Sequence, residues 1–246
     1  MRRYRQIASK ALKTQVMLTN AGLRKFIPAT SWYSGKALEK MMAAFPTVFI
    51  KPDKGGGGAG IVRVRQREDS IEICYRKECR CTDSRSLHTV LDNFLNPHKR
   101  YLIQQGIEMA KVGGRPFDIR ILMQKPKSEW MVGGMAAKVA AKGLFITNHC
   151  KGGKPLPVEE ALDRAYGQGN PLKSTILSDL IQIGRLTAEV LDSRFPGIRE
   201  LGLDVGPDSE GRLWIFEVNT RPNFHLFRRL ERDQYRRIIH RHKKLV

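Results

Sequence analysis

The alternation of apolar and polar positions predicts short helices and strands along nearly the whole chain. Apolar residues at three- and four-residue intervals indicate helices, and apolar residues at every second position indicate strands. The predicted helices are 9–21, 35–44, 86–95 and 174–195. The predicted strands are 47–50, 61–65, 71–75, 118–124, 130–139, 201–206 and 213–219. Ser9 and Ser34 are expected to cap the first two helices, and the glycine- and proline-rich stretch 152–171 is expected to be a mobile loop over the functional site.

The last pair of predicted strands contains acidic residues between aliphatic ones, which argues against a freely solvated hairpin. Glu217 and Asn219 are two residues apart, so their side chains share one face of a strand. If the connecting loop is 208–211, Asp204 lies opposite Ile215 and on that same face, whereas a five-residue loop would reverse this parity. Mg²⁺ takes few protein carboxylates and fills its other positions with water and substrate phosphates. The predicted metal ligands are therefore Asp204, Glu217 and Asn219.

A run of glycines at 55–60 directly follows the predicted strand that leads into Lys51. Glycines lack Cβ atoms, so their backbone N–H groups can approach phosphate oxygens. The candidate phosphate-binding glycines are Gly55, Gly56, Gly57 and Gly58. A flexible linker is not expected between two apolar strands, and the segment is therefore predicted to be a flap that covers phosphates.

Three other glycine-rich phosphate sites are excluded by the context of this loop. The loop fits G-x-G-x-x-G by letter, but the dinucleotide-binding version must open a helix, and here a strand follows. A P-loop ends in Lys-Ser or Lys-Thr, which this run does not. Protein kinases place a similar loop between two strands, but the V-A-I-K, H-R-D and D-F-G motifs do not occur, and Lys51 precedes the loop where a kinase lysine follows it.

Lys51-Pro52 before a glycine flap, with the distal Asp204 and Glu217-x-Asn219, resembles the ATP-grasp superfamily. The closer resemblance is to its YheC/YheD-like group, known from endospore-forming bacteria as coat-associated proteins, and it spans residues 9–227. The segments that carry it are 26–30, 49–52, 101–107, 114–120, 147–148, 152–153 and 200–204. The resemblance implies an α+β ATP-grasp fold in which two α/β lobes grip ATP between antiparallel sheets. The expected lobes are 1–103, with the flap, and 104–246, with the metal site and a basic C-terminal helix.

The resemblance also implies which residues bind ATP. Lys10 resembles the first phosphate lysine, with Lys13 as the alternative, and Lys51 resembles the second. A hinge whose backbone contacts the adenine edge is expected at Gln104, Gln105 and Ile107, where the glutamine side chains are not required. Asp118 falls where a carboxylate meets the ribose.

Four candidate catalytic residues follow from the same resemblance, namely Arg120, Lys138, Asn148 and Arg221. Lys138 resembles a basic residue near the transferred phosphate, and Asn148 matches a loop that RimK-type amino-acid ligases place beside the acyl phosphate. Arg120 shares a strand face with Asp118, and Arg221 follows the metal strand. In the alternative interpretation, Asp118 and Arg120 simply pair across a strand surface and Lys138 is a solvated edge lysine.

Composition adds a strong positive charge to this picture. The formal net charge is +20, from 44 basic and 24 acidic residues, and residues 1–13 and 224–246 supply much of the excess. Such a field attracts polyanions, while apolar positions at helical spacing predict that one face of the C-terminal segment packs on the body. No secretory signal peptide and no membrane span are predicted. Reduced thiols in a cytoplasmic protein are expected for the four cysteines, whose spacing does not favour zinc.

These features predict an ATP- and Mg²⁺-dependent ligase. By analogy with the superfamily, a substrate carboxylate attacks the γ-phosphate, and an amine or related nucleophile then displaces phosphate from the acyl phosphate. The alternative is a non-catalytic ATP-binding protein with a structural or assembly role in the spore. A nucleic-acid binder is disfavoured, because aromatic platforms and duplex-reading motifs are not recognisable. The 50 residues before Lys51 leave no room for a further N-terminal substrate domain, so substrate recognition is expected from the core, a partner chain or the termini.

Overall fold

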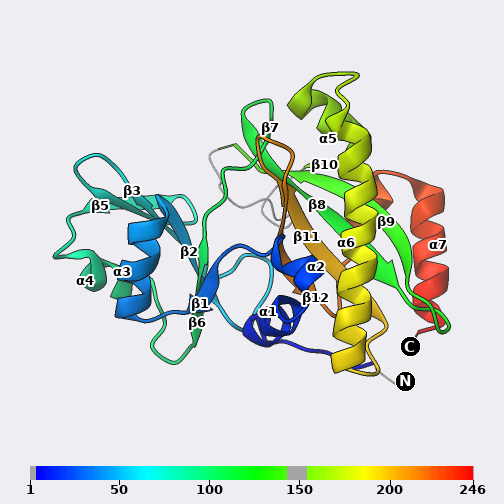
Figure 1. Cartoon of the computed structure of the whole chain (residues 1–246), viewed down its shortest axis with the longest axis horizontal. Helices are drawn as coiled ribbons and strands as arrows, with labels where there is room; N and C mark the ends of the chain where they lie inside the picture. Colours follow the sequence, from blue (N-terminus) through cyan, green and yellow to red (C-terminus); the bar gives the residue numbers. More distant parts are fainter. Residues whose placement is uncertain (1–3, 143–153, 246) are drawn as a thin grey trace. The chain divides into compact units, whose positions relative to one another are not determined.

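The computed structural model describes residues 4–142 and 154–245 and divides the chain into two compact units (Figure 1). Unit 1 comprises 1–8, 12–27 and 108–246, and unit 2 comprises 9–11 and 28–107. The sequence placed the division between residues 103 and 104 and gave the whole N-terminus to the first lobe. In the structure the division falls between Ile107 and Glu108, and most of the first 27 residues pack with unit 1.

Unit 2 is built on one antiparallel sheet with the strand order β1-β6-β2-β3-β4-β5. Its strands are β1 (Thr30–Trp32), β2 (Thr47–Pro52), β3 (Val62–Gln66), β4 (Ile71–Tyr75), β5 (Glu78–Thr82) and β6 (Tyr101–Gln105). Its helices are α3 (Gly35–Ala44) and α4 (Leu87–Asp92). Val48 and Ile50 alternate with more exposed residues along β2 and pack with Leu38 of α3 in the core of this unit. The Ser34 side chain accepts from the Ala37 N–H at 3.2 Å, which confirms the predicted cap of α3.

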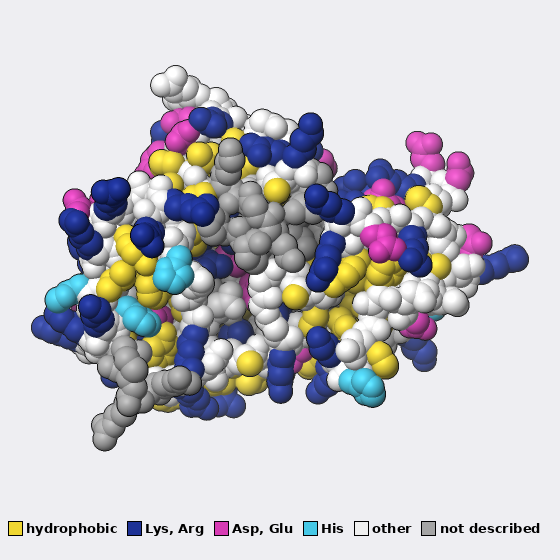
Figure 2. All heavy atoms as spheres, turned by 180° about the vertical axis from the view of Figure 1, so that it is seen from behind, with side chains coloured by type: hydrophobic (Ala, Val, Ile, Leu, Met, Phe, Trp, Pro, Cys, Tyr) yellow, Lys and Arg dark blue, Asp and Glu magenta, His cyan; other side chains and the backbone are white. Residues whose placement is uncertain are grey.

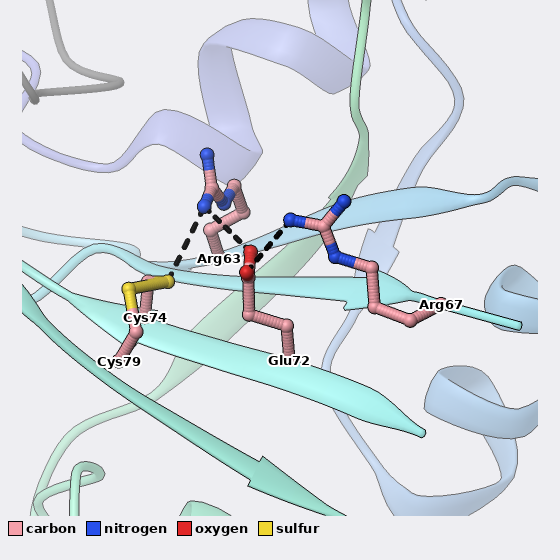
Figure 3. Close-up of a disulfide and its surroundings, with 5 residues drawn as sticks. All are labelled: Arg63, Arg67, Glu72, Cys74 and Cys79. Atoms are coloured by element: carbon pink, nitrogen blue, oxygen red, sulfur yellow. Dashed lines mark hydrogen bonds and ion pairs between the residues drawn. A yellow bond between two sulfur atoms is a disulfide. The ribbon is translucent and has the colours of Figure 1, made fainter. Parts of the chain in front are cut away.

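A disulfide joins the two strands of the β4–β5 hairpin, with 2.05 Å between the sulfur atoms of Cys74 and Cys79 (Figure 3). The two residues are direct cross-strand partners with Cα atoms 4.1 Å apart, so the register of the hairpin itself brings them together. The prediction of reduced thiols was wrong for this pair, because β5 was not recognised as a strand. Cys81 is a free, exposed thiol. The cysteines therefore no longer argue for a reducing compartment.

Unit 1 is built on a second antiparallel sheet with the strand order β10-β9-β8-β11-β12, to which β7 adds a short pair with β8. Its strands are β7 (Lys111–Val112), β8 (Arg115–Gln124), β9 (Met131–Val139), β10 (Lys154–Leu156), β11 (Glu200–Pro207) and β12 (Leu213–Asn219). Its helices are α2 (Ala21–Arg24), α5 (Val158–Tyr166), α6 (Leu172–Arg194), the 3-10 helix η2 (His225–Arg229) and α7 (Arg232–Lys243), and α1 (Lys10–Leu18) enters it from unit 2.

The two faces of this sheet have different roles, because side chains alternate along each strand. Ile119, Ile121 and Met123 of β8 pack into the large core that includes the buried residues of α6. On the opposite face, Leu122 packs in a small core with residues of η2 and α7, including Phe227 and Ile238. The prediction that apolar residues of the C-terminal segment pack on the body is therefore confirmed. Asp118 and Arg120 lie on this second face, beside the part that η2 and α7 cover.

The main departures from the predicted elements lie in the segments with the weakest periodicity. The predicted loop 152–171 was wrong in its described part, which contains β10 and α5. The predicted helix 9–21 ends at Leu18, and the Asn20 side chain caps a separate short helix by accepting from the Leu23 N–H. Among residues 4–142 and 154–245, every helix is too short or too polar to span a lipid bilayer.

Candidate functional site

The glycine loop of unit 2 connects two paired antiparallel strands, as predicted, because β2 and β3 are direct neighbours. Four of its glycines have positive φ angles, a backbone region that L side chains rarely adopt. They are Gly55, Gly57, Gly58 and Gly60. At Gly55 and Gly56 an added Cβ would meet no atom within 4 Å, so the space beside the backbone there is open. Beside Gly55 and Gly56 the loop backbone can therefore be approached closely by a phosphate.

Two lysines lie near the start of this loop: Lys10 contacts the loop, and Lys51 is near the end of the strand that leads into it. The Lys10 Nζ donates to the carbonyl oxygens of Pro52 and Gly55, at 3.1 and 2.8 Å. The Lys51 Nζ donates to the Gln104 Oε1 at 2.5 Å. Residues 9–11 are fastened to this unit by Asp53, whose Oδ1 accepts from the Ser9 hydroxyl and the Ala11 N–H.

Lys13 has a different environment from Lys10. Its side chain is 3% exposed, and its Nζ donates to the Ile7 carbonyl oxygen at 2.7 Å within unit 1. Lys10 therefore contacts the glycine loop directly, through the Gly55 carbonyl oxygen.

The predicted hinge lies at the end of β6, where unit 2 passes into unit 1. Gln104 is 5% exposed, and its amide donates to the Thr30 hydroxyl at 3.1 Å while its oxygen accepts from Lys51. The Gln105 N–H donates to the Ala29 carbonyl, and the Gln105 side-chain oxygen accepts from the Ala29 N–H. The glutamine side chains thus have structural partners, although the sequence required only their backbone. Ile107 is the last residue of unit 2.

In unit 1 the register of β11 and β12 determines whether the three predicted metal ligands share a face. Pro207 pairs with Leu213, so the loop between them has five residues and reverses the parity assumed from the sequence. The register shifts between Asp204 and Val205, which leaves Phe216 as the extra residue of a β-bulge. The predicted partner of Asp204 was Ile215, but the bulge pairs it with Glu217. Asp204, Glu217 and Asn219 therefore still lie on one face of the sheet.

The remaining contacts of this face centre on Asp204, which is 4% exposed. Arg120 binds it in a bidentate ion pair, Nε to Oδ1 at 2.7 Å and Nη2 to Oδ2 at 3.0 Å. The Lys138 Nζ donates to the same Oδ1 at 2.7 Å and lies 3.0 Å from the Asp118 Oδ1. Lys138 is 2% exposed, which rules out a solvated edge lysine, and the bidentate partner of Arg120 is Asp204 and not Asp118.

The electrostatics of this network keep Asp204 and Arg120 ionised. Burial alone would raise the pKa of the Asp204 carboxyl, but the charges and hydrogen bonds of Arg120 and Lys138 outweigh burial and hold the pKa well below its usual range. Burial would likewise lower the pKa of Arg120, but Asp204, Asp118 and Glu217 together raise it. Asp204 and Arg120 therefore remain oppositely charged partners on this face.

The donor chemistry of this face fits Mg²⁺. Glu217, directly opposite Asp204, is half-buried, and Asn219 follows two residues later on the same strand face. Hard oxygen ligands of this kind are the ones that Mg²⁺ prefers. Within the described part of the chain, no three His, Cys, Asp or Glu side chains form a metal-binding group, so the candidate set is two carboxylates and one amide.

Arg221 and Asn148 are the remaining two residues that were predicted to be catalytic. The Arg221 guanidinium donates to the Tyr4 carbonyl oxygen and lies over the Tyr4 ring, 5.4 Å from its centre. Asn148 lies outside the described residues. Glu200, a buried acid at the start of β11, contacts Tyr4 and His242. The sequence placed it in the segment 200–204 that carries the family resemblance but gave it no role of its own.

Three solved structures with similar folds are named as synthetases or as a ligase. An ADP complex of N5-carboxyaminoimidazole ribonucleotide synthetase aligns over 88% of this chain and 45% of that chain, with 13% identity and a TM-score of 0.53. The synthetase from Staphylococcus aureus, also complexed with ADP, aligns over the same shares with 9% identity and a TM-score of 0.54. The ATP-grasp ligase PsnB, complexed with a minimal precursor, aligns over 95% of this chain and 60% of its own, with 12% identity and a TM-score of 0.52. The fold is therefore the ATP-grasp fold.

The sequence comparisons identify one family among the proteins with the ATP-grasp fold. Residues 4–244 match the YheC/D-like ATP-grasp family, and the chain belongs to that family. Two similar proteins of Bacillus subtilis (strain 168) are the endospore coat-associated proteins YheD, 28% identical over 203 residues, and YheC, 24% identical over 208 residues. The aligned regions are 79% and 81% of this chain but 43% and 56% of YheD and YheC, so the chain spans about half the length of these relatives.

Proposed function

We propose that this chain is an ATP- and Mg²⁺-dependent ligase that activates a carboxylate as an acyl phosphate and transfers it to an amine or related nucleophile, with release of ADP and phosphate. The observation that carries the proposal is the buried network of Asp204, Arg120 and Lys138, directly opposite Glu217, in an ATP-grasp fold. The structural neighbours that are complexed with ADP support nucleotide binding.

The unit 2 residues would bind the phosphates of ATP. The Lys10 and Lys51 ammonium groups supply positive charge, and the glycine loop supplies backbone N–H groups, with open space beside Gly55 and Gly56. Gln104 positions the Lys51 ammonium by accepting its hydrogen bond. These residues act by binding and need no covalent step.

The unit 1 residues would serve the reacting end of the nucleotide. Asp204, Glu217 and Asn219 would hold Mg²⁺, which supplies charge neutralisation for the phosphates. Arg120 and Lys138 orient Asp204 and keep positive charge close to the position where negative charge develops. Acyl-phosphate chemistry requires two anions to be brought together and water to be excluded. A nucleophilic serine or cysteine is not needed for it.

A non-catalytic role is the second candidate, because the two similar Bacillus subtilis proteins are named for their association with the endospore coat. The charge network argues for turnover. Burying two cations and a carboxylate costs desolvation energy that a packed apolar cluster would avoid, and a protein that only binds nucleotide has no need for it.

A phosphate-release screen distinguishes the two candidates. Purified protein with ATP and Mg²⁺ would be mixed with pools of amino acids, dipeptides, acidic peptides and wall precursors, while calorimetry measures ATP affinity. The ligase proposal predicts release of phosphate and ADP in equal amounts with at least one pool. ATP binding with no turnover in any pool would support the structural role, and no ATP binding would contradict both.

A further inference from the structure

Unit 1 contains a cavity of 410 Å³ that the proposed function does not use, although Arg221, one of the four residues predicted to be catalytic, lines it. Three segments that are distant in the sequence form its walls, namely the N-terminal segment, the loop after β12 and the end of α7. The lining residues are Tyr4, Arg221, Pro222, Asn223, Phe224, His225 and His242. The loop is fixed to the sheet at Pro222, because a Cβ added to Gly202 would lie only 2.5 Å from the Pro222 Cβ.

A single buried acid holds the N-terminal and C-terminal walls together. Glu200 is fully buried, and its Oε2 accepts from the Tyr4 hydroxyl at 2.6 Å and lies 2.8 Å from the His242 Nδ1. Its Oε1 accepts from the Gln124 amide at 2.8 Å. Burial and the hydrogen bond to Glu200 raise the pKa of the Tyr4 phenol, so Tyr4 remains a neutral donor. Both oxygens of Glu200 therefore have partners inside the protein.

The open side of the cavity carries positive charge and hydrogen-bonding capacity. Arg221 is exposed, and no carboxylate of the described residues lies within ion-pair distance of it. Its contact with the Tyr4 carbonyl uses one of five N–H donors. The His242 Nδ1 donates to the Glu200 carboxylate, so this ring is held in place as part of the cavity wall. The His225 Nδ1 lies 2.9 Å from the Tyr235 hydroxyl, and in the tautomer that accepts from this hydroxyl the His225 Nε2 carries a proton that it can donate to a ligand. This chemistry fits a carboxylate.

The aromatic residues of the cavity are already in use, which disfavours a nucleobase. The Arg221 guanidinium covers the Tyr4 ring, and Phe224 packs edge-on against His242 with 5.0 Å between ring centres. Single-strand nucleic acids need free aromatic faces on which bases can stack. The rings here form walls and do not offer such a face.

A basic surface extends from the cavity along η2 and α7, formed by Arg228, Arg229, Arg232, Arg236 and Arg237, all exposed. Figure 2 shows Lys and Arg side chains crowded around His and hydrophobic side chains at the left of the view, the side of unit 1 on which α7 lies. Arg236 and Arg237 pair with exposed acids at 3.1 and 3.3 Å, and surface pairs of this kind are worth little. Arg236 and Arg237 can therefore leave these acids and pair with the carboxylates of a ligand.

We propose that the cavity docks a carboxylate-bearing residue of an acidic polypeptide, and that the basic surface binds neighbouring acidic residues of the same polypeptide. Arg221 forms the ion pair with the docked carboxylate, the His225 Nε2–H donates to it, and His242, held by Glu200, forms the wall beside it. Docking requires no nucleotide. Only the further step, that the docked polypeptide is the substrate of the ligase, rests on the proposed function.

One contact connects the loop after β12, which lines the cavity, to the candidate metal ligands. The Arg120 Nη1 donates to the Asn223 carbonyl oxygen at 3.1 Å, while the same guanidinium binds Asp204. A ligand that moves the loop therefore acts on the side chain that orients Asp204. Arg120 is in this respect a positioning residue for both sites.

The test measures binding of labelled hexaglutamate to the full chain without ATP, by fluorescence anisotropy at low and physiological salt. Hexaglutamine and a DNA hexamer are the comparison probes. Arg221→Gln is expected to weaken hexaglutamate binding about tenfold or more, because a charge-assisted hydrogen-bond pair is lost. The matched control is Arg185→Gln, an exposed arginine on α6, which is expected to leave binding within about twofold. Replacing Arg228, Arg229 and Arg232 with Gln should flatten the salt dependence.

The melting temperature of each variant separates a lost contact from a lost fold. If Arg221→Gln unfolds the N-terminal segment, His225→Gln, at an exposed position, should still weaken binding several-fold at an unchanged melting temperature. Equal affinity for hexaglutamate and hexaglutamine, or equal losses in Arg221→Gln and Arg185→Gln, would overturn the proposal. So would tighter binding of the DNA hexamer that depends on the basic surface alone. Because no nucleotide is present, failure here leaves the ligase proposal to its own phosphate-release test.

Discussion

Asp204 is the residue at which the fold and the proposed chemistry meet. It is buried between two cations and lies directly opposite Glu217. A buried carboxylate loses the solvation of water, so it stays charged only while Arg120 and Lys138 compensate it. The same charge makes it available as a metal ligand, since Oδ2 accepts a single hydrogen bond from the residues that the structure describes.

Asp204→Asn should destabilise unit 1 at neutral pH by about 3–5 kcal/mol, because two buried cations lose their partner. The pKa of Asp204 is lower in the folded than in the unfolded chain, so its stabilising contribution is complete above the unfolded value of about 3.9 and is lost as the pH falls further. Urea denaturation of parent and variant should show a constant gap above about pH 5 that closes below pH 4.

The control for this prediction is Glu189→Gln, an exposed acid on α6 of the same unit, which should change stability by no more than about 0.5 kcal/mol at any pH. A gap between parent and Asp204→Asn that is the same at pH 3 and pH 7 would show that the ion pairs do not stabilise the fold.

Lys10 and Lys13, which the sequence could not separate, should behave oppositely. Lys10→Ala removes an ammonium at the glycine loop and should weaken ATP binding about tenfold with little change in melting temperature. Lys13→Ala leaves the Ile7 carbonyl without its donor and should lower the melting temperature with less effect on ATP affinity. Calorimetry and thermal denaturation of both variants provide the comparison, and the reverse pattern would assign the phosphate role to Lys13.

At the scale of elements, the β11–β12 hairpin illustrates what the sequence could and could not predict. Apolar alternation located both strands and their acidic residues. The loop length was underestimated by one residue, and nothing in the sequence marked Phe216 as a bulge, so the two errors cancelled in the final parity. Bulges depend on tertiary packing, here on the fit of Phe216 against Gly206, and not on local propensity.

Other parts of the site could not be predicted from the sequence either, because they also depend on tertiary packing. The types of residue were sufficient to predict a charged site at Asp204, Arg120 and Lys138. Their ion pairs depend on strand register across β8, β9 and β11, which periodicity does not determine. The Cys74–Cys79 disulfide and the cavity around Glu200 likewise depend on which strands and termini become neighbours.

The glycine loop should fail as an ATP-binding element when its backbone is strained. Gly57 has a φ of 66°, so Gly57→Val forces a β-branched residue into the left-handed region and should weaken ATP binding at least tenfold. Gly113→Val imposes similar strain at φ 56° in the β7–β8 turn, where an added Cβ meets no atom within 4 Å, and should leave ATP affinity unchanged. Calorimetry that finds equal affinity in both variants and the parent would mean that the loop does not contact phosphate.

Helix α7 combines a structural face and a basic face, which substitution should separate. Ile238 is fully buried, and Ile238→Ala should cost about 2–5 kcal/mol of stability through lost packing and a cavity. Replacing the five exposed arginines of the basic surface with Gln should leave the melting temperature nearly unchanged. Thermal denaturation of both variants tests this separation. A strongly lowered melting temperature in the five-fold arginine variant would show that the charges stabilise the fold.

At the scale of the whole molecule, two antiparallel units carry the two halves of the proposed chemistry, and a net charge of +20 surrounds them. The chain spans about half the length of YheD and YheC, so it contains the ATP-grasp region that these relatives share with it. A strongly positive field speeds encounters with anionic partners and makes them dependent on salt. Positive charge on η2 and α7 therefore suits recruitment of an acidic substrate, while the chemistry is assigned to the sheet beneath them.

The most direct test of the central claim is Mg²⁺-dependent phosphate release by parent, Glu217→Gln and Glu189→Gln protein, at equal concentration and with the most active substrate pool. Losing the Glu217 charge removes a metal ligand and should reduce turnover by about two orders of magnitude or more, because the charge acts on the transition state. Glu189→Gln should match the parent, and circular dichroism should be the same for all three. Undiminished phosphate release by folded Glu217→Gln protein would contradict the assignment of this face as the site of ATP-dependent catalysis.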